Sequence, residues 1–523
     1  MINVSSPPCR RLSLLLPLLV AGSLIASLYF KESWLWMDEV LSYTLITDPS
    51  LAHLNDAVVS SMDANPPLFA NLYWLIGHGI SLNPQFLRAV SVGLFAGTLA
   101  LFYHFTTRLV GTPGLNFVFI TGLVALTYLN LTLSTQIRAY ALFLLLALGF
   151  FVSAHRLLLT PDRRGALAAL FGTGLALVMT HNFGLFYLAA SAGFFALLTG
   201  WGRHRRYVPA LLAHGLVVLV WLVVWYPRFV IQAEAGNPHS WIPLPTLPNF
   251  FSVVGELAPA LSSALERHPL FRFLPVLRFG LIIGLFAYVA VPRLRSHGRA
   301  ALTDPAFAFY LLAGFIYGAT ITLSLLVSLV HTSVFISRYL WPSHLLLVYQ
   351  LVYAGYQLMG KRAVGWERRA SRLLPVYGLL LAGFLFFQNR KVVHFPSGVL
   401  HYLPQLDPRY PVFVETADYF LPIWFHGRHP KVRYLLNWET AARRGNYLTA
   451  TVEHKILRSL KDKYGVEGIV ATEQFNRQTV PRFYVIDESS HYQMEHFIDT
   501  GQVKVVNELP ITIHGHRILE CTF

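Results

Sequence analysis

Residues 12–43 read LSLLLPLLVAGSLIASLYFKESWLWMDEVLSY, and this stretch sets the class of protein. The part from residue 12 to residue 30 is almost entirely apolar and long enough for a helix to cross a hydrocarbon core of about 30 Å. Arg10 and Arg11 precede it, and the carboxylates Asp38 and Glu39 follow it. The stretch predicts an uncleaved membrane anchor that leaves two acidic residues near the membrane surface, where charged groups are costly.

The composition extends this prediction to most of the chain. Of 523 residues, 54% are hydrophobic and only 13% are charged, which leaves too little polar surface to cover a water-soluble globule. Further apolar runs of membrane-spanning length follow the first one. The sequence therefore predicts a polytopic α-helical membrane protein.

The net charge of +15 does not indicate a nucleic-acid partner. Residues 389–523 carry 16 Lys and Arg against 14 Asp and Glu, which leaves 25 basic against 12 acidic residues for the apolar part. The excess sits in short loops between apolar runs, as the positive-inside rule requires of cytoplasmic loops. These loops lie at residues 7–11, 108, 155–165, 201–207, 291–299 and 360–372.

Keeping every basic loop in the cytoplasm fixes the number of predicted crossings at eleven, with the N-terminus inside. The short run 66–80 begins with two prolines and ends in glycines, so we expect a half-inserted or interfacial helix there. The crossings are expected at 12–30, 84–107, 115–133, 139–155, 165–180, 183–200, 207–226, 273–291, 306–330, 339–358 and 373–388.

The pattern divides the chain into a transmembrane domain, 1–390, and a small domain, 395–523. The first contains two large external loops, 31–80 and 227–272. In the second, the β-rich runs PVFVET, VRYLLN, EGIVAT, RFYVID and VKVVNEL alternate with helical patterns such as EHKILRSLKDKYG. A hairpin is expected over residues 511–523, with its turn at Gly515. We expect an extracytoplasmic α/β domain, because an odd number of crossings precedes it.

Polar residues gather at the outer ends of the predicted helices, where no basic loop explains them. They are Asp38, Glu39, Asp63, Asn65, Gln136, Arg138, Tyr140, His181, Asn182, His239, Trp241, Arg338 and Tyr339. Arginines on the outer face run against the positive-inside preference and suggest an anionic partner such as a lipid phosphate, which a guanidinium binds through two parallel hydrogen bonds. A carboxylate such as Asp38 fits the separate role of general base.

Each of these residues also has a structural interpretation. The Asp38–Glu39 pair can simply be solvated at the membrane interface, and His181 can form a hydrogen bond that ends a helix. Trp34, Trp36, Trp241 and Trp341 can form an aromatic belt. No HExxH sequence, cysteine cluster, P-loop or dinucleotide motif occurs in the sequence. We therefore expect no metal and no other cofactor.

The order of five short motifs resembles that of the bacterial class C glycosyltransferases, in the group of the protein O-mannosyltransferases and the lipid A aminoarabinose transferases. The motifs are W-x-DE at 36–39, D-x-x-PPL at 63–68, R-x-Y at 138–140, THNFG at 180–184 and S-RYLWP at 337–342. The resemblance covers about residues 12–390. It implies transfer of a sugar from a polyprenyl-phosphate donor to an acceptor on a lipid, glycan or protein, with inversion at the anomeric carbon.

The resemblance also implies roles for single residues. Asp38 would activate the acceptor, with Glu39 and Asp63 in the same catalytic group. Arg138, Tyr140, Arg338, Tyr339 and Gln136 would lie at the donor phosphate. Apart from the resemblance, we expect Asn65, His181, Asn182, His239 and Trp241 to be candidate substrate contacts because of their external position. The membrane would be a cell inner membrane with the tail domain outside.

One departure from the family pattern keeps alternatives open. Relatives often carry an acidic residue where this chain has Gln136, so this chain would handle another sugar or have lost activity. The rival functions are a transporter or flippase, a catalytically inactive lipid-sugar-binding scaffold, and, within the enzyme class, an oligosaccharide ligase or polymerase.

Overall fold

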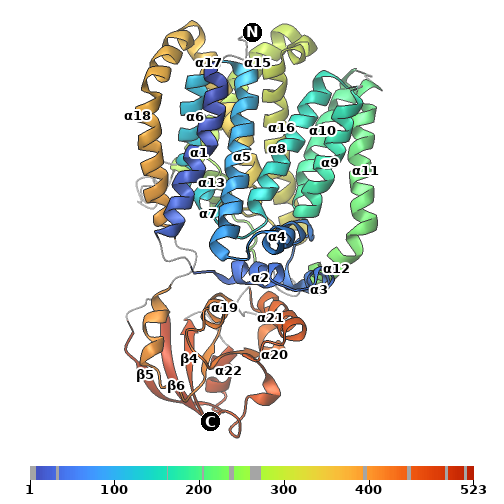
Figure 1. Ribbon diagram of the computed structural model, residues 1–523. Coiled ribbons are helices and arrows are strands. Elements are labelled where there is room, and N and C mark those ends of the chain that lie inside the picture. The colour runs from blue at the N-terminus through green and yellow to red at the C-terminus, as the bar shows by residue number, and fades with distance from the viewer. Residues whose placement is uncertain are drawn as a thin grey trace. The chain divides into compact units, whose positions relative to one another are not determined.

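The architecture is taken from a computed structural model, in which residues 7–30, 34–161, 163–202, 205–234, 241–259, 273–392, 397–443, 449–488, 493–511 and 515–523 are described. Within these residues the chain is mostly helical, and its C-terminal part contains a six-stranded sheet (Figure 1). The chain divides into two compact units. Unit 1 comprises Met1–Lys31, Asn83–Trp225 and Leu244–Val392, and unit 2 comprises Glu32–Leu82, Tyr226–Pro243 and Val393–Phe523.

Helices make up the described part of unit 1 (Figure 1). The main ones are α1 (Pro7–Tyr29), α5 (Pro84–Val110), α6 (Pro113–Ala125), α7 (Tyr128–Leu133), α8 (Tyr140–Leu159), α9 (Arg164–Thr180), α10 (Gly184–Gly202), α11 (Val208–Val224), α13 (Leu247–Glu256), α15 (Leu274–His297), α16 (Pro305–Val330), α17 (Trp341–Met359) and α18 (Ala363–Arg390). Helix α5 begins where the Asn83 side chain accepts hydrogen bonds from two backbone N–H groups and Pro84 supplies a helical φ. Asp304 and Pro305 start α16 in the same way.

Six described helical stretches are long and apolar enough to span a membrane. They are Pro84–Val110, Tyr140–Leu159, Arg205–Val224, Leu274–Thr303, Pro305–Val330 and Trp341–Arg390, the last of which contains both α17 and α18. Four shorter apolar helices accompany them, at Leu14–Tyr29, Pro113–Ala125, Arg164–Thr180 and Gly184–Gly200. These helices are those of a multi-pass membrane protein, as the composition predicts, and the finer count of eleven crossings stays a prediction.

Large apolar side chains on the outer faces of these helices support a lipid environment. Val223 on α11 is 70% exposed, Leu281 on α15 is 63% exposed and Leu379 on α18 is 77% exposed. In water each such side chain would forgo a burial free energy of about 1.5–3 kcal/mol. Lipid tails remove this cost, since they are as apolar as the side chains themselves.

The helix boundaries differ from the predicted crossings in two places. The predicted crossing 115–133 is two helices, α6 and α7, separated at Leu126 and by Thr127, whose backbone is extended (φ −103°, ψ 106°). The predicted crossing 373–388 is part of the longer α18, which begins at Ala363. Its first turns contain Glu and Arg, which are strong helix formers, so the basic loop continues into the helix.

The sheet in unit 2 is mixed. Its strands are β1 (Val412–Val414), β2 (Val432–Leu436), β3 (Ile469–Ala471), β4 (Arg482–Glu488), β5 (Lys504–Leu509) and β6 (His516–Thr522). The order is β3-β2-β1-β4-β6-β5; the pairs β2–β3, β1–β2 and β1–β4 are parallel, and the pairs β4–β6 and β5–β6 are antiparallel. The crossovers contain α19 (Ala417–Phe425) and α21 (Ala450–Tyr464).

This region confirms the predicted α/β character of the tail. The runs expected to be strands form β1 to β5, and the expected helix forms α21, which ends at Gly465 with a φ of 64° that favours glycine. Gly515, at the expected hairpin turn, has a φ of 78°, and residues 512–514 lie outside the described residues. The strand that pairs with β6 across this turn is β5, which ends at Leu509, before the expected hairpin begins. The core contains Phe413, Phe475, Phe483, Phe497 and Leu519.

Segments from the two predicted external loops complete unit 2. The first supplies α2 (Met37–Ile46), α3 (Leu51–Ala57), a π-helical turn (Val58–Met62) and α4 (Leu68–Gly79), and the second supplies α12 (Tyr226–Glu234). The Leu35 N–H donates to Nε2 of His426 (3.1 Å), and the ring of Tyr43 lies 5.4 Å from that of Phe425. The first loop therefore packs on the α/β region. Helix α4 confirms the helix expected at 66–80, whereas its interfacial position stays a prediction.

Candidate functional site

An irregular segment between α7 and α8 carries the first two predicted donor-site residues of unit 1. Gln136 is buried and Arg138 is half-buried, and α8 begins two residues later at Tyr140. The hydroxyl of Ser91, on α5, donates to the backbone carbonyl of Gln136 (2.6 Å) and ties the segment to that helix. The position of Arg138 is therefore set by a packed loop end rather than by a long exposed loop.

His181 follows the last turn of α9 and is 4% exposed. Its Nδ1 accepts a hydrogen bond from the backbone N–H of Phe183 (3.1 Å). Aromatic rings surround it: the ring centroids of Tyr339, Phe143 and Tyr140 lie 4.8, 5.0 and 6.1 Å from that of His181. The structure thus brings three predicted site residues, His181, Tyr140 and Tyr339, into one cluster.

Both predicted arginines affect the pKa of His181. Burial lowers the pKa of His181, and the positive charges of Arg138 and Arg338 lower it further. The imidazole is therefore neutral at pH 7. Since Nδ1 accepts the Phe183 N–H, the proton of the neutral ring is on Nε2.

The Nε2–H group of His181 is buried and has no hydrogen-bond partner among the described residues. A buried donor without an acceptor costs about 1–3 kcal/mol, so this group is poised to donate to a bound ligand. With the guanidinium groups of Arg138 and Arg338 nearby, the cluster offers donors of hydrogen bonds and positive charge. This combination suits a phosphate oxygen.

The segment between α16 and α17 holds Arg338 and Tyr339, both half-buried. It is fixed at two points: the backbone N–H of Val334 donates to Ser328 Oγ (2.9 Å), and the Ser337 hydroxyl donates to the carboxylate of Glu256. The Arg338 guanidinium carbon lies 6.0 Å from the Tyr339 ring centroid. Glu256, at the end of α13, was not predicted as a site residue.

A buried polar network at the start of α17 also escaped the sequence analysis. The side-chain amide of Asn130 lies 2.9 Å from Nε2 of His344, and its carbonyl oxygen accepts from the indole N–H of Trp341 (2.7 Å). Nδ1 of His344 lies 2.8 Å from the carbonyl oxygen of Leu257. The network joins α7, α17 and the segment after α13. Its signal in the sequence is a histidine and an asparagine inside apolar runs.

Arg88 is a buried arginine that the sequence analysis did not include beside Arg138 and Arg338. It lies in the second turn of α5, is 1% exposed, and precedes Ser91 by three residues, so the two side chains share a helix face. The available signal was an arginine just inside the external end of a predicted crossing, the same signal that identified Arg138 and Arg338.

The predicted catalytic carboxylates belong to unit 2. Asp38 and Glu39 lie in the first turn of α2, where the positive end of the helix dipole stabilises negative charge. Glu39 is fully buried and Asp38 is half-buried. Of the two, Asp38 has the carboxylate with access to a ligand.

Asp63 ends the π-helical turn and is 8% exposed. Its carboxylate accepts hydrogen bonds from the backbone N–H and the side-chain amide of Asn65 (both 3.1 Å). Its backbone carbonyl accepts from the side-chain amide of Gln232, on α12 (2.8 Å). Asp63 and Asn65 therefore form a local turn, an arrangement that by itself requires no substrate.

The remaining candidate contacts are divided between the units. Asn182 is half-buried beside His181 in unit 1, and Trp241 is half-buried in unit 2. His239 lies outside the described residues. The predicted large loop, 227–272, does not form one element, because its first part belongs to unit 2 and the described residues from Leu244 on belong to unit 1.

The described residues contain no group of three or more His, Cys, Asp or Glu side chains placed to hold a metal ion. Comparison of the chain with models of known protein families and with curated proteins finds no match.

Proposed function

We propose that this protein is a membrane glycosyltransferase that moves a sugar from a polyprenyl-phosphate donor to an acceptor hydroxyl on the extracytoplasmic side, with inversion. The observation that carries the proposal is the cluster of Arg138, Arg338 and His181 in a unit built from apolar helices. Two positive charges and a neutral N–H donor suit a phosphate on a membrane-embedded chain. The order of the sequence motifs adds the sugar and the acceptor.

The transfer depends on groups that stabilise the negative charge of the leaving phosphate, and arginines can do this without a metal. As the bond between the anomeric carbon and the phosphate oxygen breaks, its electron pair stays on the leaving phosphate. Arg138 and Arg338 stabilise the charge that develops there, and the Nε2–H group of His181 donates to one phosphate oxygen. Tyr140 and Tyr339 flank His181 and shield its Nε2–H group from water.

Asp38 has the second role. It accepts the proton of the acceptor hydroxyl while the hydroxyl oxygen attacks the anomeric carbon from the face opposite the phosphate. A new glycosidic bond forms, the sugar–phosphate bond breaks, and polyprenyl phosphate leaves. The configuration at the anomeric carbon is inverted by this single displacement. Glu39 and Asp63 support the chain around the base.

The proposal includes a topology. The chain crosses the membrane eleven times, as in a class C glycosyltransferase, with the N-terminus in the cytoplasm and residues 395–523 outside. The membrane is the inner membrane of a cell that exports lipid-linked sugars. The support is the distribution of basic residues in short loops. The acceptor is a lipid, a glycan or a protein.

The test is sugar release from a panel of polyprenyl-phosphate sugars by purified protein, with mass spectrometry of the lipids. Wild type should convert one donor to polyprenyl phosphate when the acceptor is present, and Asp38→Asn should do so slower by about 10²–10⁴-fold. Glu473→Gln, an exposed carboxylate change in the α/β region, is the matched control. Binding of a donor without turnover by wild type would favour the inactive scaffold, with Gln136 as its cause. Movement of intact donor across a bilayer would favour the flippase.

A further inference from the structure

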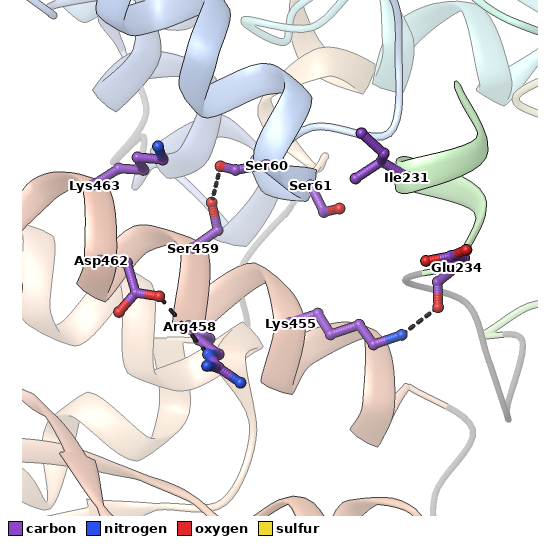
Figure 2. A pocket seen from close by; sticks show the side chains of 9 residues that line it. All are labelled: Ser60, Ser61, Ile231, Glu234, Lys455, Arg458, Ser459, Asp462 and Lys463. Atoms are coloured by element: carbon purple, nitrogen blue, oxygen red, sulfur yellow. Dashed lines mark hydrogen bonds and ion pairs between the residues drawn. The ribbon is translucent and has the colours of Figure 1, made fainter. Parts of the chain in front are cut away.

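A pocket of about 270 Å³ lies within unit 2, and its lining includes no residue of α2 (Figure 2). Three segments distant in sequence line it: the π-helical turn, α12 and α21. Lys455, Arg458 and Lys463 bring three positive charges to its wall, and Ser60, Ser61 and Ser459 bring hydroxyl groups. Glu234 and Asp462 add two carboxylates to the lining, and Asp56, which pairs with Lys463, adds a third beside it.

The basic residues come from one face of α21. Positions 455, 458, 459, 462 and 463 follow the three- and four-residue spacing of a helix face. The opposite face of the helix is buried, with Leu457 and Leu460 both 0% exposed. The basic face therefore has a fixed orientation, because the helix cannot rotate without exposing its apolar face.

The ion pair that Arg458 makes is exposed, so a ligand can replace its partner. Arg458 and Asp462 form a long ion pair of 3.7 Å between side chains that are 68% and 60% exposed. Exposed pairs of this kind contribute about 0–1 kcal/mol, so an entering anion can replace Asp462 at low cost. Lys463 pairs with Asp56, and Lys455 donates to the backbone carbonyl of Glu234.

The wall opposite α21 is held in an unusual backbone shape. Ser61 has a φ of 79°, in the left-handed region that a residue with a Cβ rarely adopts. Gln232 holds the turn by donating to the carbonyls of Val58 (3.0 Å) and Asp63, and Ser60 Oγ lies 2.5 Å from Ser459 Oγ. Figure 2 shows Ser61 projecting from this turn toward the side of the pocket where Lys455 lies. Non-glycine residues in such strained positions cluster at ligand sites.

We propose that this pocket binds a phosphate group, and that the phosphate is carried by the acceptor; the second part rests on the proposed glycosyltransferase function. Arg458 offers two parallel N–H donors, Lys455 and Lys463 offer point charges, and the serine hydroxyls complete the shell of a tetrahedral oxyanion. The volume suits a headgroup of sugar-phosphate size. The acceptor class would then be a phosphorylated sugar or a phosphorylated lipid headgroup.

The experiment measures binding on the full-length protein in phosphatidylcholine nanodiscs, without donor. The probes are inorganic phosphate and glucose 6-phosphate, titrated calorimetrically. Wild type should bind both saturably, and Lys455→Met/Arg458→Gln should weaken binding roughly tenfold or more, because two charge-assisted contacts are lost. Lys461→Gln, on the same helix but outside the pocket, is the matched control and should bind as wild type.

A second readout guards against a folding defect in the double variant. Phosphate should protect Lys455 and Lys463 of wild-type protein from acetic anhydride and leave Lys461 unprotected. Nanodiscs containing phosphatidic acid should abolish binding of the soluble probes if a lipid headgroup is the natural source, and leave it unchanged if the source is soluble. No saturable binding, or equal protection of all three lysines, would overturn the proposal. Because no donor is present, a negative sugar-transfer assay does not decide this result.

Discussion

At the scale of single residues, the account depends on Arg138 and Arg338 binding one phosphate. Replacing either with Gln should lower transfer by about 10²–10³-fold, the loss that accompanies removal of one charge-stabilising donor. Lysine at the same positions should restore part of the activity, because it keeps the charge and loses the planar fork. Steady-state kinetics with the active donor check this.

Arg228 provides the control for this prediction. It is an exposed arginine on α12 in unit 2, and we expect Arg228→Gln to act as wild type. If Arg138→Gln and Arg338→Gln also kept wild-type kinetics, these arginines would have no role in phosphate binding, and the cluster around His181 would be structural.

A buried carboxyl group in the α/β region gives a prediction on pH. Glu415 follows β1 and is 4% exposed; burial and then the negative charge of Asp487 raise its pKa well above 4.5. The folded state therefore keeps a proton that the unfolded chain releases above about pH 4.5. Its contribution to stability is complete below that pH and is lost as the pH rises.

Glu415→Gln should remove this dependence and still accept the hydrogen bond that the Met494 N–H now donates (2.7 Å). We expect the variant to exceed wild type at pH 8 by on the order of 1 kcal/mol, since one pKa unit corresponds to about 1.4 kcal/mol. The difference should shrink toward pH 4.5. Hydrogen exchange of β1 and β4 amides in the full chain measures it, and a difference that grew on acidification would contradict the assignment.

The sequence singles out the arginines and His181 as candidates because a polar side chain at the end of a membrane helix is unusual even when it is considered alone. It does not identify Asn130 and His344 as partners, because they are 214 residues apart. Nor does it predict that Nε2 of His181 carries the proton. That conclusion needs the backbone N–H of Phe183, whose direction depends on how the chain turns after α9.

At the scale of elements, the π-helical turn before Asp63 depends on hydrogen bonds from another element. Gln232 satisfies the carbonyls of Val58 and Asp63 from a different element, α12. Gln232→Ala should leave these buried acceptors without their donor and destabilise the turn by about 1–3 kcal/mol. Faster hydrogen exchange in residues 57–65 is the expected result.

Ser61→Gly serves as the complement. Glycine adopts a positive φ without the steric penalty of a Cβ, so the variant should keep or slow the wild-type exchange rate of the turn. Unchanged exchange in Gln232→Ala would mean that the turn does not depend on α12.

Whether an element could be predicted from the sequence depends on whether its own residues carry the signal. The strands of the tail alternate or cluster β-branched and aromatic residues, and each lies near turn residues, so they were predictable. The break between α6 and α7 was not, because Leu126 and Thr127 interrupt the run without glycine or proline. The π-helical turn was not either, since its partners lie in other segments.

At the scale of the whole molecule, the basic loops predict which side of the membrane each loop faces. In a Cys9→Ser/Cys521→Ser background, a cysteine at Arg163 should resist a membrane-impermeant maleimide in intact cells, and a cysteine at His401 should react. Labelling of both positions from the same side would contradict the eleven-crossing topology and the extracytoplasmic placement of the tail.

The division into two compact units could not be predicted from composition. Composition changes near residue 390, which suggests one boundary, whereas unit 2 also takes in residues 32–82 and 226–243. These segments have apolar faces that pack within unit 2, and sequence periodicity alone cannot show which core an amphipathic segment joins. The proposed base and the proposed donor-phosphate ligands consequently belong to different units.

The central claim is that Asp38 removes the acceptor proton while the arginine cluster holds the donor. The most direct measurement follows donor binding and polyprenyl phosphate release in one sample, for wild type and for Asp38→Asn. The account predicts donor binding within about twofold of wild type and release slower by about 10²–10⁴-fold, the range that a general base supplies. Wild-type release by Asp38→Asn in the presence of acceptor would contradict it.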